Sequence, residues 1–137
     1  MTFPFPSDAW VKALMVEINQ SAAYAEAAKT WEGDFLFVVD PAAGSLAQPV
    51  RLYMDLWHGQ CREAAELAAT SDKTPAFLLS GTAPTWKKVL LKQVDPIQAM
   101  VTGQLKVKGN MAVLLKNVKA AKELVACCPL VPTAFPD

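Results

Sequence analysis

The chain has 137 residues, which suits one domain with a core of its own and leaves little room for a second. Hydrophobic residues make up 53% and charged residues 19%, and the formal net charge of zero does not favour nucleic-acid binding. No apolar run approaches the roughly 18 residues of a membrane span, and neither end reads as a secretory or peroxisomal signal, so we expect a cytoplasmic protein.

The N-terminal part of the chain predicts helices followed by strands. Ser7 is suited to cap a helix over residues 8–19, because apolar side chains recur at helical spacing behind it. The alanine-rich stretch 21–30 also favours a helix and is compatible with a continuation of the first one after a kink. Short apolar or alternating runs then predict strands over 35–39 and 50–57.

The middle of the chain contains one ambiguous segment. His58 and Gly59 fit a tight reversal, because glycine tolerates a positive φ. The composition of residues 61–67 favours a helix by propensity, whereas a position after a hairpin turn favours a strand. Residues 76–79 are a clearer strand.

Two short helices, a strand and a last helix complete the predicted elements. Thr82 and Asp95 each serve as an N-cap ahead of a proline in the first helical turn. Alternation predicts a strand over 104–108. One helix is predicted over 111–125, with lysines on its solvent side and an apolar stripe of Met111, Leu114, Val118, Ala121 and Val125.

The element order indicates the fold class. Helix, antiparallel strands, short helices, strand and helix in succession are typical of an α+β domain and not of alternating α/β units. We expect residues 1–137 to form one domain, with irregular tails at 1–6 and 129–137.

Residues that carry catalytic chemistry are sparse. The single histidine, His58, lies at a predicted turn, and Cys61, Cys127 and Cys128 lack metal-binding spacing and indicate reduced, partly buried thiols. No nucleophile elbow, phosphate-binding loop, dinucleotide fingerprint or zinc-protease motif occurs. We therefore expect a non-enzyme without catalytic residues, metal or cofactor. An enzyme that uses His58 and the thiols is the least supported hypothesis.

Three motifs follow one another in the second half of the chain. They are Thr85-Trp86-Lys87-Lys88-Val89-Leu90, Val94-Asp95-Pro96-Ile97-Gln98-Ala99-Met100 and Gly103-Gln104-Leu105-Lys106-Val107-Lys108-Gly109. The segment 77–115 that contains them resembles the C-terminal half of a sterol carrier protein type two domain. The resemblance implies a mixed, largely antiparallel sheet of about five strands, with helices packed on one face and an apolar cavity between them.

Members of that family bind fatty acids, fatty acyl-CoA, sterols or other lipids, so the resemblance implies non-catalytic binding or transfer of a hydrophobic ligand in the cavity. A chain of a dozen methylenes supplies roughly 9 kcal/mol there before entropic costs. The residues that we expect at the ligand are Phe77, Leu79, Trp86, Leu90, Ile97, Met100, Val101, Gln104, Met111 and Leu115. The apolar ones are equally compatible with plain core packing, and Gln104 with a solvent-facing side chain instead of a headgroup partner.

The alternative function is an accessory module that docks on an enzyme or an anionic membrane and presents a lipid. Residues 1–69 hold 4 basic and 9 acidic side chains, whereas residues 70–137 hold 9 basic and 4 acidic ones. This asymmetry predicts either an ordinary mixed surface or a basic face. The lysines that motivate a basic face are Lys106, Lys108, Lys116, Lys119 and Lys122. A small apolar domain is compatible with a homodimer, although the sequence offers no symmetry evidence for one.

Overall fold

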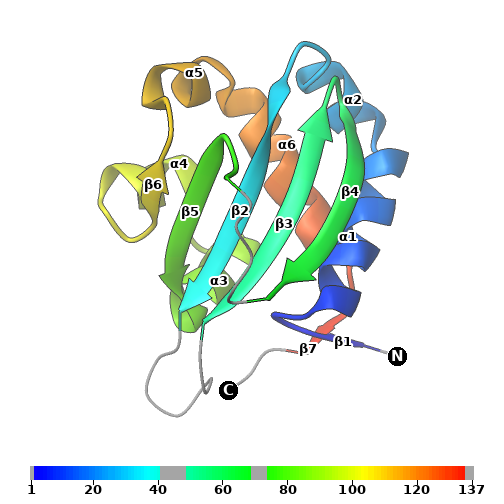
Figure 1. Ribbon diagram of the computed structural model, residues 1–137, viewed down its shortest axis with the longest axis vertical. Helices are drawn as coiled ribbons and strands as arrows, with labels where there is room; N and C mark the ends of the chain where they lie inside the picture. The colour runs from blue at the N-terminus through cyan, green and yellow to red at the C-terminus, as the bar shows by residue number, and fades with distance from the viewer. Residues whose placement is uncertain (1, 41–48, 69–73, 135–137) are drawn as a thin grey trace.

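The computed structural model describes residues 2–40, 49–68 and 74–134, and a five-stranded sheet is its largest element (Figure 1). The strands are β2 (Glu32–Asp40), β3 (Val50–Trp57), β4 (Gln60–Leu67), β5 (Phe77–Thr82) and β6 (Lys106–Lys108). They lie in the order β4-β3-β2-β5-β6. The β2–β5 pair is parallel and the other neighbouring pairs are antiparallel. The expected α+β fold with a mixed, largely antiparallel sheet is confirmed.

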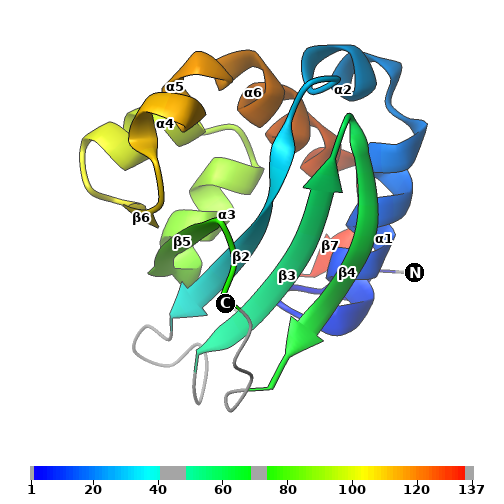
Figure 2. The same cartoon turned by 45° about the horizontal axis from the view of Figure 1, so that its top comes forward.

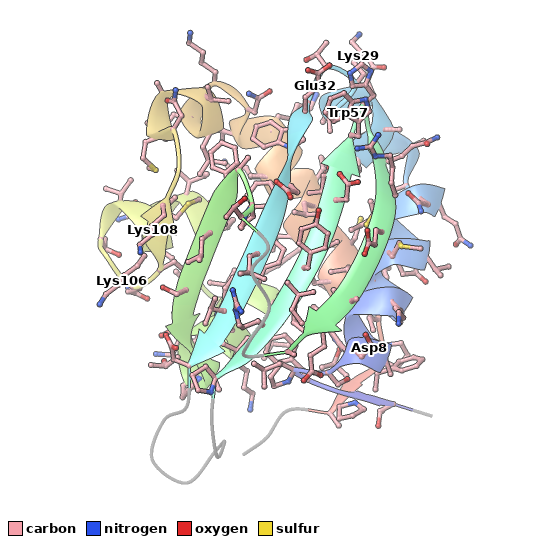
Figure 3. All side chains as sticks on the ribbon, in the orientation of Figure 1. Asp8, Lys29, Glu32, Trp57, Lys106 and Lys108 are labelled. Atoms are coloured by element: carbon pink, nitrogen blue, oxygen red, sulfur yellow. The ribbon has the colours of Figure 1, made fainter. Side chains whose placement is uncertain are left out.

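The helices gather on one face of this sheet, and Figure 2 shows them behind it and over its upper end. They are α1 (Asp8–Gln20), α2 (Ala22–Ala27), α3 (Ala83–Leu90), α4 (Pro96–Val101), α5 (Met111–Lys116) and α6 (Val118–Cys127), followed by a short 3₁₀ turn, Cys128–Leu130. The opposite face, which is turned toward the viewer in Figure 3, carries no helix of the described residues. The core therefore lies between the inner face of the sheet and the helical layer.

The first helical stretch is divided at Ser21, at the position of the expected kink. The Ser7 hydroxyl accepts from the Trp10 backbone N–H and caps α1, and the Ser21 hydroxyl accepts from the Tyr24 N–H and caps α2. Apolar residues at helical spacing, Trp10 and Leu14 among them, bury one side of α1 against the sheet. Tyr24 is the buried residue of the helix that begins after Ser21.

The ambiguous segment 61–67 is a strand. It pairs with β3 in an antiparallel hairpin whose turn residues His58 and Gly59 have φ values of +49° and +82°. Positive φ at both central residues is the geometry of a type I′ hairpin turn. Backbone pairing with β3 overrides the helical propensity of residues 61–67, because propensity amounts to a few tenths of a kcal/mol per residue.

The single last helix that the sequence predicts is divided into α5 and α6 at Asn117, so this prediction is wrong. Asn117 has φ −117° and ψ +34°, which lie outside helical values. Its side-chain amide donates to the Val113 carbonyl at 2.8 Å and so satisfies a carbonyl at the end of α5. The strand predicted over 104–108 is also shorter than expected, because only 106–108 pair with β5. The caps at Thr82 and Asp95 are confirmed.

The chain ends are not wholly irregular, contrary to the prediction. Strand β1 (Phe3–Pro4) pairs in parallel with β7 (Thr133–Ala134). The Trp10 indole N–H donates to the Thr133 hydroxyl at 2.9 Å and ties this pair to α1. The remaining residues of the predicted tails, 1 and 135–137, lie outside the described residues.

Candidate ligand-binding site

The inner face of the sheet carries a row of aromatic side chains. Phe35 and Phe37 alternate along β2 and so point to the same side, with their ring centroids 5.6 Å apart. Trp31, just before β2, stacks on Phe35 at 5.6 Å. On α3, Trp86 meets Phe37 edge to face at 5.5 Å. Large, rigid rings thus cover the sheet where the helices cross it.

A first hollow of about 60 Å³ lies between these rings and the helical layer. Its sheet side consists of Phe35, Phe37, Leu56 and Leu79, with Trp31 beside them. Helices α2, α3, α4, α5 and α6 form its other side, together with the loop residue Leu105. The lining residues on these helices and at the α5–α6 junction are Tyr24, Trp86, Val89, Pro96, Met100, Leu114, Asn117, Ala120, Ala121, Leu124 and Val125.

A second hollow of about 40 Å³ lies along the same face of the sheet, toward β1 and α1. It is lined by Phe5, Trp10, Leu14, Phe37, Val39, Leu52, Met54, Trp86, Leu90, Leu124, Val125 and Cys128. Four of these residues, Phe37, Trp86, Leu124 and Val125, also line the first hollow. The two hollows therefore adjoin each other and together follow the long direction of β2.

Side-chain size explains why the first hollow does not close. Where α6 crosses the rings of β2, its lining residues include Ala120 and Ala121, whose side chains are single methyl groups. The aromatic rings opposite have few rotamers and cannot bend into the remaining space. The Trp86 indole is further held by a hydrogen bond from Nε1 to the Val38 carbonyl, at 3.0 Å. Rigid rings facing short side chains leave a space that is not filled.

Both hollows are uncharged. Among the described residues, no Asp, Glu, Lys, Arg or His lines either one, and no charged side chain of that part of the chain is fully buried. Besides the two indoles, two lining residues of the first hollow have a nitrogen or oxygen in the side chain, the Asn117 amide and the Tyr24 hydroxyl. Burial raises the pKa of that hydroxyl well above its usual value, so it is neutral at physiological pH. Such walls suit hydrocarbon and offer no counter-charge to an ion.

The structure brings together four of the ten residues that the sequence predicts at the ligand. Leu79 and Met100 line the first hollow, Leu90 lines the second, and Trp86 lines both. The other six line neither hollow, and they are Phe77, Ile97, Val101, Gln104, Met111 and Leu115. Phe77 is buried beside Trp31 and Phe35, and Met111 is half-buried against the core. Ile97 is half-buried, and Gln104 is exposed.

Several lining residues escaped sequence reasoning. Trp31, Phe35 and Phe37 lie outside the segment 77–115 that contains the three motifs. The alternation of Phe35, Phe37 and Val39 was the available signal, because it places them on one face of a strand. Ala120 and Leu124 escaped because the predicted stripe of one long helix ran through Ala121 and Val125. The break at Asn117 rotates α6, so Ala120 and Leu124 are buried while Ala121 and Val125 are half-buried.

The cysteine side chains are poor nucleophiles in this setting. All three are free and buried. Burial raises the pKa of the Cys61 thiol to about 12 and shifts those of Cys127 and Cys128 in the same direction. His58 lies at the hairpin tip and lines neither hollow, and its Nε2 is 2.6 Å from a Glu32 carboxylate oxygen. Within the described ranges, no group of three or more His, Cys, Asp and Glu side chains is placed to hold a metal ion.

None of the helices in the described part of the chain has the length and apolar character needed to cross a bilayer.

Comparison with known proteins relates this geometry to one family and one fold. The model of the SCP-2 sterol transfer family matches residues 12–122. No curated protein sequence matches the chain significantly. A crystal structure of sterol carrier protein 2 is 35% identical, with a TM-score of 0.83, and the match covers 91% of this chain and 97% of that one.

Two further solved structures extend the comparison. A conserved hypothetical protein from Thermus thermophilus, described as possibly a sterol carrier protein, is 34% identical, with a TM-score of 0.82, and the match covers 92% of this chain and 88% of that one. The ubiquinone synthesis protein UbiJ-SCP2 is 14% identical, with a TM-score of 0.56, and the match covers 90% and 91% of the two chains. The last likeness shows the fold alone.

Proposed function

Since this chain belongs to the SCP-2 sterol transfer family, we propose that it binds a fatty acid, fatty acyl-CoA, sterol or related lipid in the two hollows, without a catalytic step. Family membership implies lipid binding or transfer in the broad sense. The observation that supports the specific proposal is the uncharged wall around the space between the sheet and the helices.

The hollows have to widen to take such a ligand. A cavity of about 150 Å³ holds one benzene ring, so spaces of about 60 and 40 Å³ are too small for a lipid. The short helices α4 and α5 are the parts of the wall that move most easily, because each buries one residue, Ala99 and Leu114 respectively. Burial of about 0.8 kcal/mol per methylene offsets the cost of parting them.

The uncharged lining of the two hollows also determines where the polar headgroup of the ligand lies. A carboxylate or phosphate inside either hollow would be buried without a counter-charge, which costs several kcal/mol or more. An ionised head therefore stays at the surface, with only its hydrocarbon tail inside. A single hydroxyl, as on a sterol, can instead lie inside beside the Asn117 amide, which lines the first hollow.

Lipid binding is tested directly on the purified protein. Native mass spectrometry and organic extraction should reveal a co-purifying lipid, and a dansyl-labelled undecanoate should bind at micromolar concentration or tighter, with its emission enhanced in the apolar hollow. Competition with fatty acids, acyl-CoA and sterols then ranks the ligand classes. The proposal is contradicted when no member of these three classes binds or competes.

A second candidate function is the accessory module that docks on an anionic membrane or an enzyme and presents lipid there. Exposed apolar side chains on α4 and α5 favour it, since Val101 is 68% and Leu115 is 48% exposed. Lys106 and Lys108 lie on β6, the strand that connects these two helices, and both are exposed (Figure 3). The fold's occurrence in a ubiquinone synthesis protein is consistent with this role.

A basic rim around exposed apolar groups suits an anionic bilayer surface. The cytoplasmic leaflet is such a surface, and a cytoplasmic location also suits three free, buried cysteines. We therefore place the protein in the cytoplasm under this candidate function. If the protein presents its lipid to an enzyme, that enzyme would bind the same surface of α4, β6 and α5.

Charge reversal tests the docking function. Replacing Lys116, Lys119 and Lys122 with glutamate should abolish association with phosphatidylserine-containing vesicles, because each basic residue near such a surface contributes about 1 kcal/mol. All three are exposed, and Lys122 has an acidic neighbour, with its Nζ 3.7 Å from an Asp95 oxygen. Co-sedimentation measures the association.

The matched control reverses Lys12, Lys29 and Lys88, which lie on α1, after α2 and on α3, so that the net charge changes by the same amount. This variant should retain more of the vesicle association than the first. Equal association of both variants and the wild type would remove the docking function and leave the lipid-binding proposal in place.

A further inference from the structure

Phe37 and Trp86 lie where the two hollows adjoin. Both rings line both hollows, together with Leu124 and Val125 of α6. The two rings meet edge to face, with their planes at 89°. Phe37 belongs to the sheet, whereas the other three belong to helices. These four side chains therefore form the wall between the hollows.

The two rings of this wall differ in the free energy needed to displace them. The Trp86 indole donates its N–H to the Val38 carbonyl at 3.0 Å, so turning the indole breaks that hydrogen bond. Phe37 has no polar group, is only half-buried, and is held by apolar contacts, including a stacked one with Phe35. Displacing Phe37 therefore costs less than displacing Trp86.

The second hollow differs from the first in chemistry. Its donor groups already have partners, since the Trp10 indole N–H bonds to the Thr133 hydroxyl and the Cys128 thiol to the Leu124 carbonyl. The Trp86 indole N–H likewise bonds to the Val38 carbonyl, and apart from the Met54 thioether its other lining side chains are hydrocarbon or aromatic. The first hollow, by contrast, includes Asn117, whose amide nitrogen donates one N–H to the Val113 carbonyl and carries a second. A ligand with one polar end and one apolar end is therefore accommodated with its polar end on the side of the first hollow.

We propose that the second hollow is a separate site for the far end of a long, unbranched hydrocarbon chain, which reaches it by displacing Phe37. The inference rests on the proposed function, because it requires a lipid in the first hollow. A chain that ends before Phe37 uses the first hollow alone. Each methylene beyond that point is buried in the second hollow and strengthens binding by up to about fourfold.

Two matched substitutions separate the hollows. Val39 lines the second hollow only and Val89 the first only, and both valines are 1% exposed. Val39→Phe should fill the second hollow and leave the first open, whereas Val89→Phe should fill the first. Dissociation constants for dodecanoate, hexadecanoate and eicosanoate are measured by displacement of dansyl-labelled undecanoate.

The expected result is selective for chain length. Val39→Phe should lose the gain in affinity between dodecanoate and eicosanoate, about tenfold or more once two methylenes are excluded, with dodecanoate the least affected of the three acids. Val89→Phe should weaken all three acids. If Val39→Phe weakens all three equally, or none, the second hollow is not a tail site. If the wild type binds none of the three acids, the tail site is contradicted, and the proposed function is contradicted as well only when acyl-CoA and sterols do not bind either.

A smaller substitution at the same position tests the tail site even if Val39→Phe does not fold. Val39→Met adds less bulk than a phenyl ring and bends into the available space. It should reduce the preference for eicosanoate in the same direction and by a smaller factor. Thermal unfolding with a transition as cooperative as that of the wild type establishes that each variant is folded, so that a changed length preference reports on the hollow.

Discussion

Replacing Gly59 with alanine should lower the free energy of unfolding by about 3 kcal/mol. Gly59 has a φ of +82° at the tip of the β3–β4 hairpin, a conformation that costs an L-residue about 1–2 kcal/mol. An added Cβ would also lie 2.7 Å from the Ala25 carbonyl oxygen and 2.9 Å from the Ala25 Cα. The backbone of α2 would have to shift, and α2 carries Tyr24, which lines the first hollow. Urea unfolding measures the loss.

Gly103 provides a matched control. Its φ of +83° is nearly the same, but an added Cβ there has no atom within 4 Å. Gly103→Ala should therefore cost only the conformational part, about 1–2 kcal/mol. If the two alanine variants lose the same stability, the close approach of α2 to the hairpin tip does not contribute.

Replacing Ala121 with phenylalanine should weaken lipid binding by about tenfold or more. Ala121 lies on α6 and lines the first hollow, and its methyl group is half-buried, so a phenyl ring has room to enter the hollow. Excluding two methylenes of the ligand removes about 1.6 kcal/mol of binding free energy, which corresponds to that factor. Stability should change little, because the ring fills existing space. Titration with dansyl-labelled undecanoate measures the affinity.

The same substitution on a solvent-facing position is the control. Ala112 lies on α5, is exposed and lines neither hollow. Ala112→Phe should leave the dissociation constant unchanged. Unaltered binding in Ala121→Phe, with the fold intact, would mean that the ligand lies elsewhere than in the first hollow.

Local signals in the sequence were sufficient for the parts of the fold that depend on neighbouring residues. The capping side chains of Ser7 and Asp95 accept hydrogen bonds from the backbone of the next few residues, so their role is visible in a short window. His58 and Gly59 define their turn in the same way. The three motifs within 77–115 identified the family, which the match over 12–122 confirms.

Features that depend on tertiary pairing could not be predicted in this way. Residues 61–67 favour a helix in isolation and form a strand because β3 supplies the hydrogen-bonding partner. The break at Asn117 separates α5 from α6 in a stretch whose apolar spacing is compatible with one helix. The pairing of residues 3–4 with 133–134 joins the two ends of the chain and leaves no local signal.

The candidate site likewise contains residues that the sequence could predict and residues that it could not. Trp86 could be anticipated because it belongs to a motif, and it lines both hollows. Val101 and Leu115 share its segment but are largely exposed, since α4 and α5 each turn only one residue fully inward. Phe37 could not be assigned to the ligand wall, because the face of β2 that meets the helices is determined by strands and helices distant in sequence.

Quenching of tryptophan fluorescence by a dibrominated fatty acid tests most directly whether hydrocarbon occupies the space between sheet and helices. Trp31 and Trp86 line the first hollow, whereas Trp57 lies at the hairpin tip and is 38% exposed. Titration should quench the emission of the buried tryptophans, and the quenching should persist in a Trp57→Phe variant. An absence of quenching at saturating ligand, or quenching that disappears with Trp57, would show that the hollows do not hold the acyl chain.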